Sequence, residues 1–495
     1  MQKRNAPIKL SGDEFRKLGH QLVNDLGALL DALPDKAVTP GEVPSTVRKA
    51  LPTVTLPQFG MNPEVLIKEA TNLLAEHSLF NSHPRFAGYV TSPPAPVGIL
   101  AELLAATINA NVGAWILAPM ATEIEQQTIA WIAELIGYPT DCGGILVSGG
   151  NMANFVGFLA ARHAKAPRLR EEGLSSTQQQ PQRIYASKEV HTWLQKAADL
   201  FGFGTKHIRW ISTTNDQIMD CNALEKTIED DIAHGDRPFL VVASAGTVST
   251  GAIDPLVQIR AICDKHALWL HVDGAYGAFA AVAPDCPETL NHLQLADSIA
   301  LDPHKWLYAP LEAGCALVKD RELMQNAFSY SPPYYKMGEV GGEETIDYVN
   351  FGPQNSRGFK ALKVWMALRH VGRAAYARMI ADDMRLSRLL FDLANGNAEL
   401  QALTNSLSIT TFRYVPRRLD MERLSESDET YLNELNLALL TMLQESGKVF
   451  VSNAVVNNRY LLRACIVNFR TDVEDIQAII DTVIEFGRIA DASLI

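Results

Sequence analysis

The spacing of apolar residues changes along the chain. Over residues 15–30 they recur every three or four positions, as on one face of an amphipathic helix. Ser11 and Glu14 precede this stretch at the spacing of a capping box, which predicts where the helix starts. From residue 143 onwards, short apolar runs alternate with helical patterns. This alternation predicts a mainly parallel sheet that is covered by helices on both faces.

The strands predicted in this alternating region are short and mostly apolar. They comprise residues 145–147, 183–186, 207–212, 239–243, 268–273, 298–301 and 316–318. The helices predicted between them comprise residues 153–163, 190–200 and 256–265. Sites in such sheets lie at the carboxyl ends of the strands. We therefore expect side chains that follow residues 147, 273 and 301 to meet there.

Three regions follow from the pattern. Residues 1–80 form a helical segment whose apolar stripe must cover either its own domain or a partner subunit. Residues 81–370 form a large α/β domain, and residues 371–495 form a smaller α+β domain. The smaller domain is predicted to have strands near residues 407–414 and 461–469 and helices at residues 430–445 and 473–489.

Three stretches are predicted to be irregular. Residues 34–57 are interrupted by prolines and should be extended. Residues 167–182 have few apolar positions and read as an insertion. Residues 331–348 are rich in Pro, Gly, Tyr and Glu and should form a long loop. Loops of that length inside compact domains are often functional.

Composition is that of an ordinary globular protein of more than one domain, with 495 residues, 47% of them apolar. Its 44 basic and 56 acidic residues give a net charge of −12, which argues against a nucleic-acid or anionic-membrane surface. Six cysteines form no CxxC pair, so we expect free thiols and no metal site. No secretory signal or membrane span is visible, and we expect a cytoplasmic location.

Candidate chemistry gathers at the ends of two predicted strands, one closing on Asp273 and the other followed by Lys305. Lysine forms Schiff bases with carbonyl groups. Pyridoxal phosphate (PLP) is the cofactor that most often uses one, and it takes an acid at its ring nitrogen. Ala275 and His191 are candidates for the two faces of the ring. A histidine or a strand-end acid is often structural, so only the combination indicates a cofactor.

An anion site for the cofactor phosphate is also available. Gly150 and Asn151 stand where a predicted strand passes into a helix. Glycine lets the backbone approach an anion, and the start of a helix offers free N–H groups. His304 and Thr247 could donate further hydrogen bonds to the phosphate or the ring hydroxyl.

The motifs DPHKWL at residues 302–307 and HVDGAYG at residues 271–277 resemble those of group II PLP-dependent amino-acid decarboxylases of fold type I, in particular the aromatic-L-amino-acid decarboxylases. Segments such as SGGNMANFVGFLAAR and SRGFKALKVWMALRHVG extend the resemblance over nearly the whole chain. The resemblance implies a fold type I PLP-dependent transferase-like architecture with a seven-stranded, mainly parallel sheet. It also implies a homodimer with shared active sites, embraced by the N-terminal helices.

The resemblance implies roles for single residues. Lys305 would carry the Schiff base, Asp273 would pair with the pyridinium nitrogen, and His191 would stack on the ring. The residues holding the phosphate would be Gly150, Asn151, His304 and, from the neighbouring subunit, Ser356. Thr91 and Trp115 would line the substrate pocket. Tyr334, on a loop of the partner subunit, would protonate the substrate carbon, although the adjacent Tyr335 leaves the register open.

The expected reaction is decarboxylation of an L-amino acid to the amine and CO₂. Apart from Arg85, no arginine near Thr91 or Trp115 is placed to hold a side-chain carboxylate, which favours an aromatic substrate. One alternative is an acidic amino-acid decarboxylase (glutamate, aspartate or diaminobutyrate type) or an aldehyde synthase of the same fold. Another is a catalytically silent binding protein, against which the intact Lys305, Asp273 and His191 argue.

Overall fold

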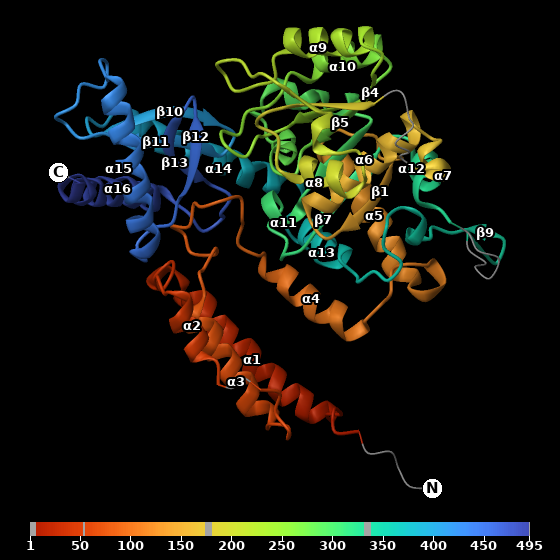
Figure 1. The fold of residues 1–495 in the computed structure, drawn as a ribbon. Coiled ribbons are helices and arrows are strands. Elements are labelled where there is room, and N and C mark those ends of the chain that lie inside the picture. Colours follow the sequence, from red (N-terminus) through yellow and green to blue (C-terminus); the bar gives the residue numbers. More distant parts are fainter. Residues whose placement is uncertain (1–5, 53–54, 174–180, 331–337, 495) are drawn as a thin grey trace.

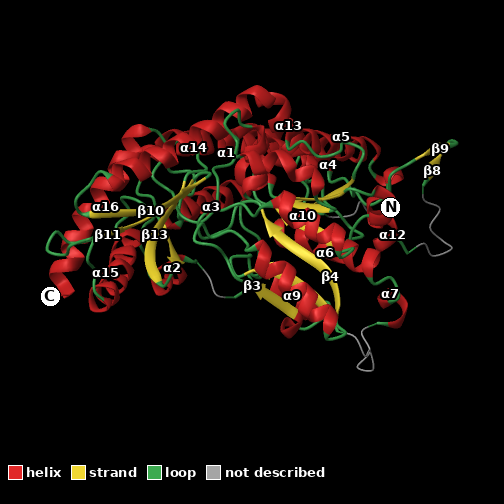
Figure 2. Cartoon of the chain, turned by 90° about the horizontal axis from the view of Figure 1, so that it is seen from above, coloured by secondary structure: helices red, strands yellow, loops and turns green. Residues whose placement is uncertain are grey.

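The computed structural model describes residues 6–52, 55–173, 181–330 and 338–494. Figure 1 shows a body that carries two sheets and an arm of N-terminal helices that extends away from it. The two sheets lie at opposite ends of the body, each flanked by helices (Figure 2). None of the helices in the described part of the chain is both long and apolar enough to cross a membrane.

The large sheet has seven strands in the order β1-β7-β6-β5-β4-β2-β3. Their bounds are β1 Gly143–Val147, β2 Gln182–Ser187, β3 Ile208–Ile211, β4 Arg237–Ser244, β5 Trp269–Asp273, β6 Ser298–Leu301 and β7 Gly314–Val318. The pairs from β6 to β3 are parallel, and β7 runs antiparallel to both of its neighbours. The predicted fold class, a mainly parallel seven-stranded sheet, is confirmed.

Helices flank the sheet (Figure 2), and most of its strand positions are apolar. The helices of this region are α4 Pro96–Ile108, α5 Pro119–Leu135, α6 Gly150–Lys165, α8 Trp193–Leu200, α9 Cys221–Ala233, α10 Leu256–Lys265, α11 Pro303–Trp306, α12 Arg321–Phe328 and α13 Ala361–Val371. Every residue of β1, β6 and β7 is buried. Helix α6 packs across β5, β6 and β7. Its first turn therefore lies at one edge of the sheet.

The second sheet has the order β10-β11-β13-β12 and is antiparallel. Its elements are β10 Leu400–Ser406, β11 Ile409–Tyr414, β12 Ser452–Val456 and β13 Arg459–Cys465, with helices α14 Arg373–Asn395, α15 Glu426–Glu445 and α16 Val473–Leu494. Buried leucine and isoleucine side chains of these helices and strands form a separate apolar core. The division of the chain at residues 80 and 370 stays a prediction.

The N-terminal arm consists of α1 Gly12–Ala32, α2 Pro44–Ala50 and α3 Pro63–His77. The predicted capping box is confirmed: the Glu14 amide donates to Oγ of Ser11 at 3.2 Å, and the Ser11 amide donates to Oε2 of Glu14 at 2.8 Å. Helix α1 packs along α3. Leu18 is the one buried residue of α1. Phe15 is exposed and the leucines at positions 22, 26, 29 and 30 are half-buried, so the described residues cover the apolar stripe of α1 only in part.

Some predicted irregular stretches contain regular structure. The extended conformation predicted for residues 34–57 is wrong for α2, because Pro44 occupies the first turn of that helix, where a missing N–H costs nothing. A helical turn, α7 Leu169–Glu172, lies within the predicted insertion. A short hairpin, β8 Glu339–Val340 and β9 Glu343–Glu344, lies within the predicted long loop.

Candidate active site

A cavity of about 390 Å³ opens at the carboxyl ends of the large sheet's parallel strands. Most of the site residues predicted from the sequence line it together. They are Gly150, Asn151, His191, Thr247, Asp273, Ala275, His304 and Lys305. The size is that of an ordinary small-molecule or cofactor pocket.

Lys305 lies on α11, the single helical turn that follows β6. Its Nζ is 3.0 Å from Oδ2 of Asp302, and the lysine side chain is 23% exposed whereas that of Asp302 is 3% exposed. Trp306 fixes the turn from behind. Its ring stacks on Tyr276 with centroids 4.9 Å apart, and its indole N–H donates to Oδ2 of Asp383 at 2.8 Å. The amine therefore projects into the cavity from a rigid base.

Asp273 is the last residue of β5, next to the strand that leads to Lys305. Its Oδ2 accepts a hydrogen bond from the indole N–H of Trp193 at 2.7 Å, and its Oδ1 accepts one from the amide of Ala275 at 3.2 Å. Each carboxylate oxygen has two lone pairs. Both oxygens can thus accept a further donor, such as a protonated ring nitrogen, without losing these bonds.

His191 lies between β2 and α8 at the edge of the cavity. Its Nδ1 accepts a hydrogen bond from the Trp193 amide at 3.3 Å, so a neutral ring carries its proton on Nε2. Desolvation lowers the pKa of His191, and the carboxylate of Asp273 opposes that effect. A neutral imidazole with a free N–H suits stacking on a ring and proton transfer near it.

The turn between β1 and α6 forms an anion site. Gly149 has a φ of 83°, which glycine adopts readily. A Cβ added to Gly150 would lie 2.6 Å from Oδ2 of Asp302 and 3.3 Å from Cβ of Ala275, so this close approach requires glycine. Within the described residues, the amides of Gly150 and Asn151 have no hydrogen-bond acceptor. Free N–H groups at a helix start favour a bound anion.

His304 and Thr247 are already engaged within the protein. Nδ1 of His304 lies 2.8 Å from the carbonyl oxygen of Ala313, which places the imidazole proton on Nδ1. Desolvation lowers the pKa of His304, so Nε2 can donate to an anion only when that anion draws a second proton onto the ring. Oγ1 of Thr247 lies 3.1 Å from Oγ1 of Thr250, within its own turn.

The predicted substrate-binding residues lie outside the lining of this cavity. Thr91 is half-buried beside Val90, which does line it. Trp115 donates from its indole N–H to Oε1 of Glu123 at 2.7 Å. Arg85, the one arginine considered for a substrate carboxylate, donates to Oδ1 of Asp475 at 3.1 Å instead. The roles of Thr91 and Trp115 stay predictions.

Two further residues, Ser356 and Tyr334, are predicted for a site shared between subunits. Ser356 is exposed and does not line the cavity of its own chain. The neighbouring Arg357 is buried and pairs with the fully buried Glu125, which fixes the segment that carries Ser356. Tyr334, like Tyr335, lies outside the described residues. The roles of Ser356 and Tyr334 also stay predictions.

Two functional contacts escaped the sequence analysis. Asp302 pairs with Lys305 three positions later, a spacing that faces two side chains toward each other on a helical turn and could have revealed the pair. Trp193 and Asp273 are 80 positions apart, and no local pattern connects them. Glu189 and Glu312 also line the cavity.

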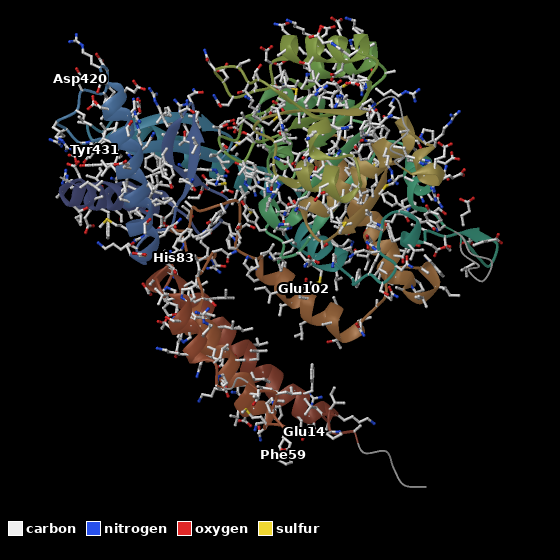
Figure 3. The ribbon with its side chains drawn as sticks, in the orientation of Figure 1. Glu14, Phe59, His83, Glu102, Asp420 and Tyr431 are labelled. Atoms are coloured by element: carbon white, nitrogen blue, oxygen red, sulfur yellow. The ribbon has the colours of Figure 1, made fainter. Side chains whose placement is uncertain are left out.

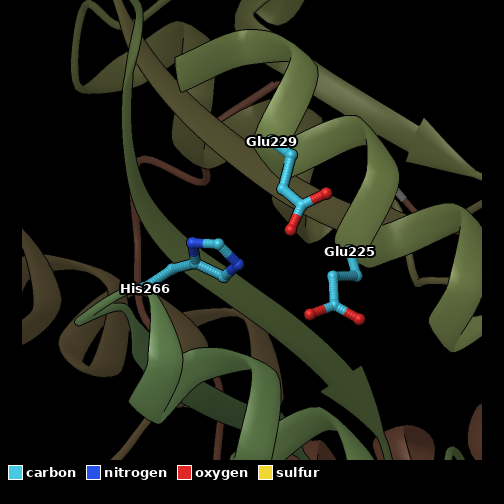
Figure 4. Close-up of side chains that lie close together, drawn as sticks. All are labelled: Glu225, Glu229 and His266. Carbon is cyan, nitrogen blue, oxygen red and sulfur yellow. The ribbon is translucent and has the colours of Figure 1, made fainter. Parts of the chain in front are cut away.

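A second cluster of titratable groups lies away from the cavity. Glu225 and Glu229 on α9 face His266 at the end of α10 (Figure 4), with candidate ligand atoms all within 4.8 Å of one another. Nζ of Lys265 bonds Oε1 of Glu225 at 2.7 Å and Oε1 of Glu229 at 2.9 Å. The ammonium group therefore bridges both carboxylates and balances one of their two charges, and none of the three residues lines the cavity.

The fold and the cavity together define a class of enzyme. The donor set fits PLP, with an amine for the aldehyde in Lys305, an acid for the ring nitrogen in Asp273, and free amides for the phosphate at Gly150 and Asn151. The glycine turn supports this fit, because a side chain at Gly150 would clash with Asp302, so glycine is what lets the turn approach the cavity this closely. These features are those of a fold type I PLP-dependent enzyme.

Known proteins identify the family. Residues 44–415 match the pyridoxal-dependent decarboxylase conserved domain. The chain is 32% identical over 469 residues to an aromatic-L-amino-acid decarboxylase of Bacillus atrophaeus, with 94% of each covered. It is 28% identical to a phenylacetaldehyde synthase of a Rosa hybrid cultivar, covering 92% of this chain and 90% of that one. The crystal structure of Oryza sativa TDC with PLP and tryptamine superposes with a TM-score of 0.89, at 25% identity and over 98% of this chain and 99% of that one.

The chain therefore belongs to the pyridoxal-dependent decarboxylase family. It is a PLP-dependent amino-acid decarboxylase, and the expectation of a cofactor enzyme drawn from Lys305 and Asp273 is confirmed.

Proposed function

We propose that the protein converts an aromatic L-amino acid to the corresponding amine and CO₂, as a homodimer with shared active sites. The observation that carries the proposal is the meeting of Lys305 and Asp273 in one cavity, beside the anion turn of α6. When bound, PLP supplies an electron sink for the bond that releases CO₂. The residues of the chain bind and orient the cofactor and move protons.

Charge in the cavity supports an uncharged substrate side chain. Among the described lining residues, Lys305 is the one lysine or arginine, and the cofactor takes its amine. Glu189 and Glu312 add carboxylates, and Glu312 pairs with Lys360 at 2.9 Å. A glutamate or aspartate side chain would meet no free cation there. Both the Bacillus enzyme and the rice structure carry aromatic names or ligands, which agrees with this reading.

Each cavity residue has a defined task in this account. Asp273 holds a proton on the ring nitrogen, and Trp193 keeps its carboxylate oriented. Gly150 and Asn151 anchor the phosphate through backbone amides. With PLP bound, His191 would stack on the ring and would assist the return of a proton to the substrate carbon. We assign the main proton donor to Tyr334 of the partner subunit, on the strength of the family resemblance.

The homodimer is supported by apolar surface that the single chain leaves bare. In the N-terminal arm, Phe15 is 54% exposed and Phe59 is 81% exposed. Phe59 and Glu14 lie at the far end of that arm, remote from the body (Figure 3). Isolated apolar residues on a surface are ordinary, but these lie on an arm that projects from the body, where a partner subunit would cover them. The cytoplasm is the proposed location, which agrees with six cysteines that are all free thiols.

A screen of the twenty amino acids for CO₂ release, with identification of the organic product, tests this function. We expect an aromatic L-amino acid to give CO₂ and amine in equal amounts, and Lys305→Ala to give neither. Release of CO₂ from acidic amino acids alone would overturn the substrate assignment. An aldehyde in place of the amine would instead make the protein an aldehyde synthase, as in the rose relative. The presence of both His191 and Tyr334 in this chain favours the amine over the aldehyde as the product.

A further inference from the structure

A buried hydrogen-bond network links strands β5 and β6 to the anion turn at the start of α6. The indole N–H of Trp269 donates to Oγ of Ser298 at 2.8 Å, and that Oγ lies 2.7 Å from Nδ1 of His271. Nε2 of His271 lies 2.8 Å from Oδ1 of Asn154, whose Nδ2 donates to the carbonyl oxygen of Gly150 at 2.9 Å. All four side chains are buried, so water does not compete for these bonds.

The two ends of the network fix its direction. An indole N–H can only donate, and a carbonyl oxygen can only accept. The bond to Gly150 turns Nδ2 of Asn154 toward that carbonyl and Oδ1 toward His271. Nε2 of His271 must therefore carry the proton, and Nδ1 of the neutral ring accepts from the Ser298 hydroxyl. Burial lowers the pKa of His271 to about 4, although Asp273 opposes this, so the ring is neutral at neutral pH.

Gly157 makes room for this network against the middle of α6. A Cβ at this position would lie 2.4 Å from Cε1 of His271 and 3.2 Å from Oγ of Ser298. The imidazole also packs edge-on against Trp193, with ring centroids 5.6 Å apart. Trp193 is the residue that donates to Asp273. His271 therefore contacts the side chain that orients the ring acid as well as the side chain that bonds the anion turn.

The last bond of the network acts on a backbone donor of the anion turn. The Gly150 carbonyl and the Asn151 amide belong to one planar trans peptide unit, so they point in opposite directions. Asn154 lies one helical turn beyond Gly150, so its bond draws the carbonyl along α6 and directs the Asn151 N–H out of the helix start. Gly149 and Gly150 give the backbone extra conformational freedom at this point. The buried side-chain bond therefore adds a restraint where the turn has most freedom to move.

We propose that His271 is a positioning residue for the cofactor phosphate. Through Asn154 it holds the Gly150–Asn151 peptide so that the Asn151 amide faces the bound anion. This inference rests on the phosphate role assigned to that amide under the proposed function. His271 does not line the cavity, whereas Asn154 does, so His271 acts on the cofactor through its neighbour. The effect is confined to the phosphate end, because the ring acid and the Schiff-base lysine lie outside the network.

Comparison of PLP with pyridoxal, which lacks the phosphate, tests the proposal. Spectroscopic titration of stripped protein gives the Kd of each ligand. His271→Phe keeps an aromatic ring but ends the network. We expect its Kd for PLP to rise by about tenfold, as for loss of a hydrogen bond to a charged group, and its Kd for pyridoxal to stay at the wild-type value. Trp193→Phe is the contrast and should raise both Kd values alike, because both ligands carry the ring nitrogen.

Three outcomes of these titrations would overturn the proposal. One is a parallel rise for PLP and pyridoxal in His271→Phe, which would make His271 a residue that only supports the fold. Another is no change for either ligand. The third is a wild type that binds pyridoxal as tightly as PLP, which would remove the phosphate assignment itself. No substrate is present in these titrations, so they are independent of which amino acid the protein decarboxylates.

His271→Gln is a second variant for the case in which phenylalanine disturbs the core. Its side-chain amide can still donate to Oδ1 of Asn154, so it should retain more of the affinity for PLP than His271→Phe does. Equal losses in the two variants would show that a donor at this position does not matter. The wild type offers an independent measurement, because ¹⁵N-labelled histidine resonances that are missing from His271→Gln belong to His271. They should show a neutral ring with its proton on Nε2, and a proton on Nδ1 would overturn the proposal.

Discussion

The indole N–H of Trp193 donates to Oδ2 of Asp273 at 2.7 Å, although the two residues are 80 positions apart in the chain. Trp193 is wholly buried, so this hydrogen bond is shielded from water. It fixes the orientation of the carboxylate that we assign to the cofactor ring. The acid of the site is therefore positioned by a residue of α8, two positions after the ring-stacking candidate His191.

Trp193→Phe should weaken PLP binding. The substitution leaves Oδ2 of Asp273 without its donor, and a hydrogen bond to a charged group contributes roughly 1.5–3 kcal/mol. We expect the Kd for PLP to rise by about tenfold or more, since each 1.4 kcal/mol corresponds to about tenfold. A spectroscopic titration with PLP measures it. Trp365→Phe, at a tryptophan that bonds Gln127 away from the cavity, is the matched control and should leave the Kd unchanged. An unchanged Kd in Trp193→Phe would show that the bond does not position Asp273.

Asp383 should make the stability depend on pH. Burial raises its pKa from 3.8 to about 7, against the hydrogen bonds donated by Trp306 and Tyr308. The folded state then holds this proton more tightly than the unfolded chain. The protonated Asp383 side chain therefore adds to the free energy of unfolding. This contribution is complete below about pH 4 and is lost as the pH rises to about 7. Urea unfolding at about pH 5 and pH 8 should show the wild type losing about 3 kcal/mol more than Asp383→Asn. Parallel losses in the two proteins would mean that Asp383 is ionised throughout.

Glu125→Gln should destabilise the protein strongly. Glu125 and Arg357 form an ion pair in which both side chains are buried, and Glu125 also accepts the Leu146 amide at 2.9 Å. Removing one charge leaves the other buried and unpaired, which costs about 3–5 kcal/mol. The free energy of unfolding measures the loss. Glu134→Gln is the control, because its pairing with Arg373 is exposed and contributes at most about 1 kcal/mol. Similar losses in both variants would show that the buried ion pair contributes no more to stability than the exposed one.

Tyr334→Phe should separate CO₂ release from amine formation. The residue lies outside the described part of the chain, and its role comes from the family resemblance. A positioned proton donor contributes about 10²–10⁴-fold to a rate. We expect amine formation to slow by about that factor while CO₂ release persists, and aldehyde to accumulate. Tyr335→Phe is the control for the register. Amine formation at the wild-type rate in Tyr334→Phe would show that the proton comes from elsewhere.

Much of the fold follows from local sequence patterns. The strands of the large sheet are predictable because helices cover both faces, which favours apolar residues at most strand positions. Helix α1 starts where its capping box stands. Helix α2 was missed because prolines suggest extended chain, whereas Pro44 lies in the first turn, the one helical position that accepts it. Helix α9 escaped prediction because only Leu224, Ile228 and Asp231 of it are buried.

The site, too, is only partly predictable from the sequence. Lys305 and Asp273 are predictable because each ends or follows an apolar strand in a specific motif. The Trp193 bond is not predictable, since it depends on how α8 packs against β5 across 80 positions. The positions of Ser356 and Tyr334 in the site are unpredictable for a different reason. Their proposed roles require a second copy of the chain, and no pattern within one copy predicts the geometry between copies.

Borohydride reduction of the PLP-loaded protein, followed by peptide mapping, tests the central claim most directly. Reduction converts a Schiff base into a stable secondary amine and so marks the lysine that carries it. We predict the pyridoxyl group on the peptide that contains Lys305, with none on the buried Lys363 and none anywhere in Lys305→Ala. A label on another lysine, or no label in a protein that still releases CO₂, would contradict the account.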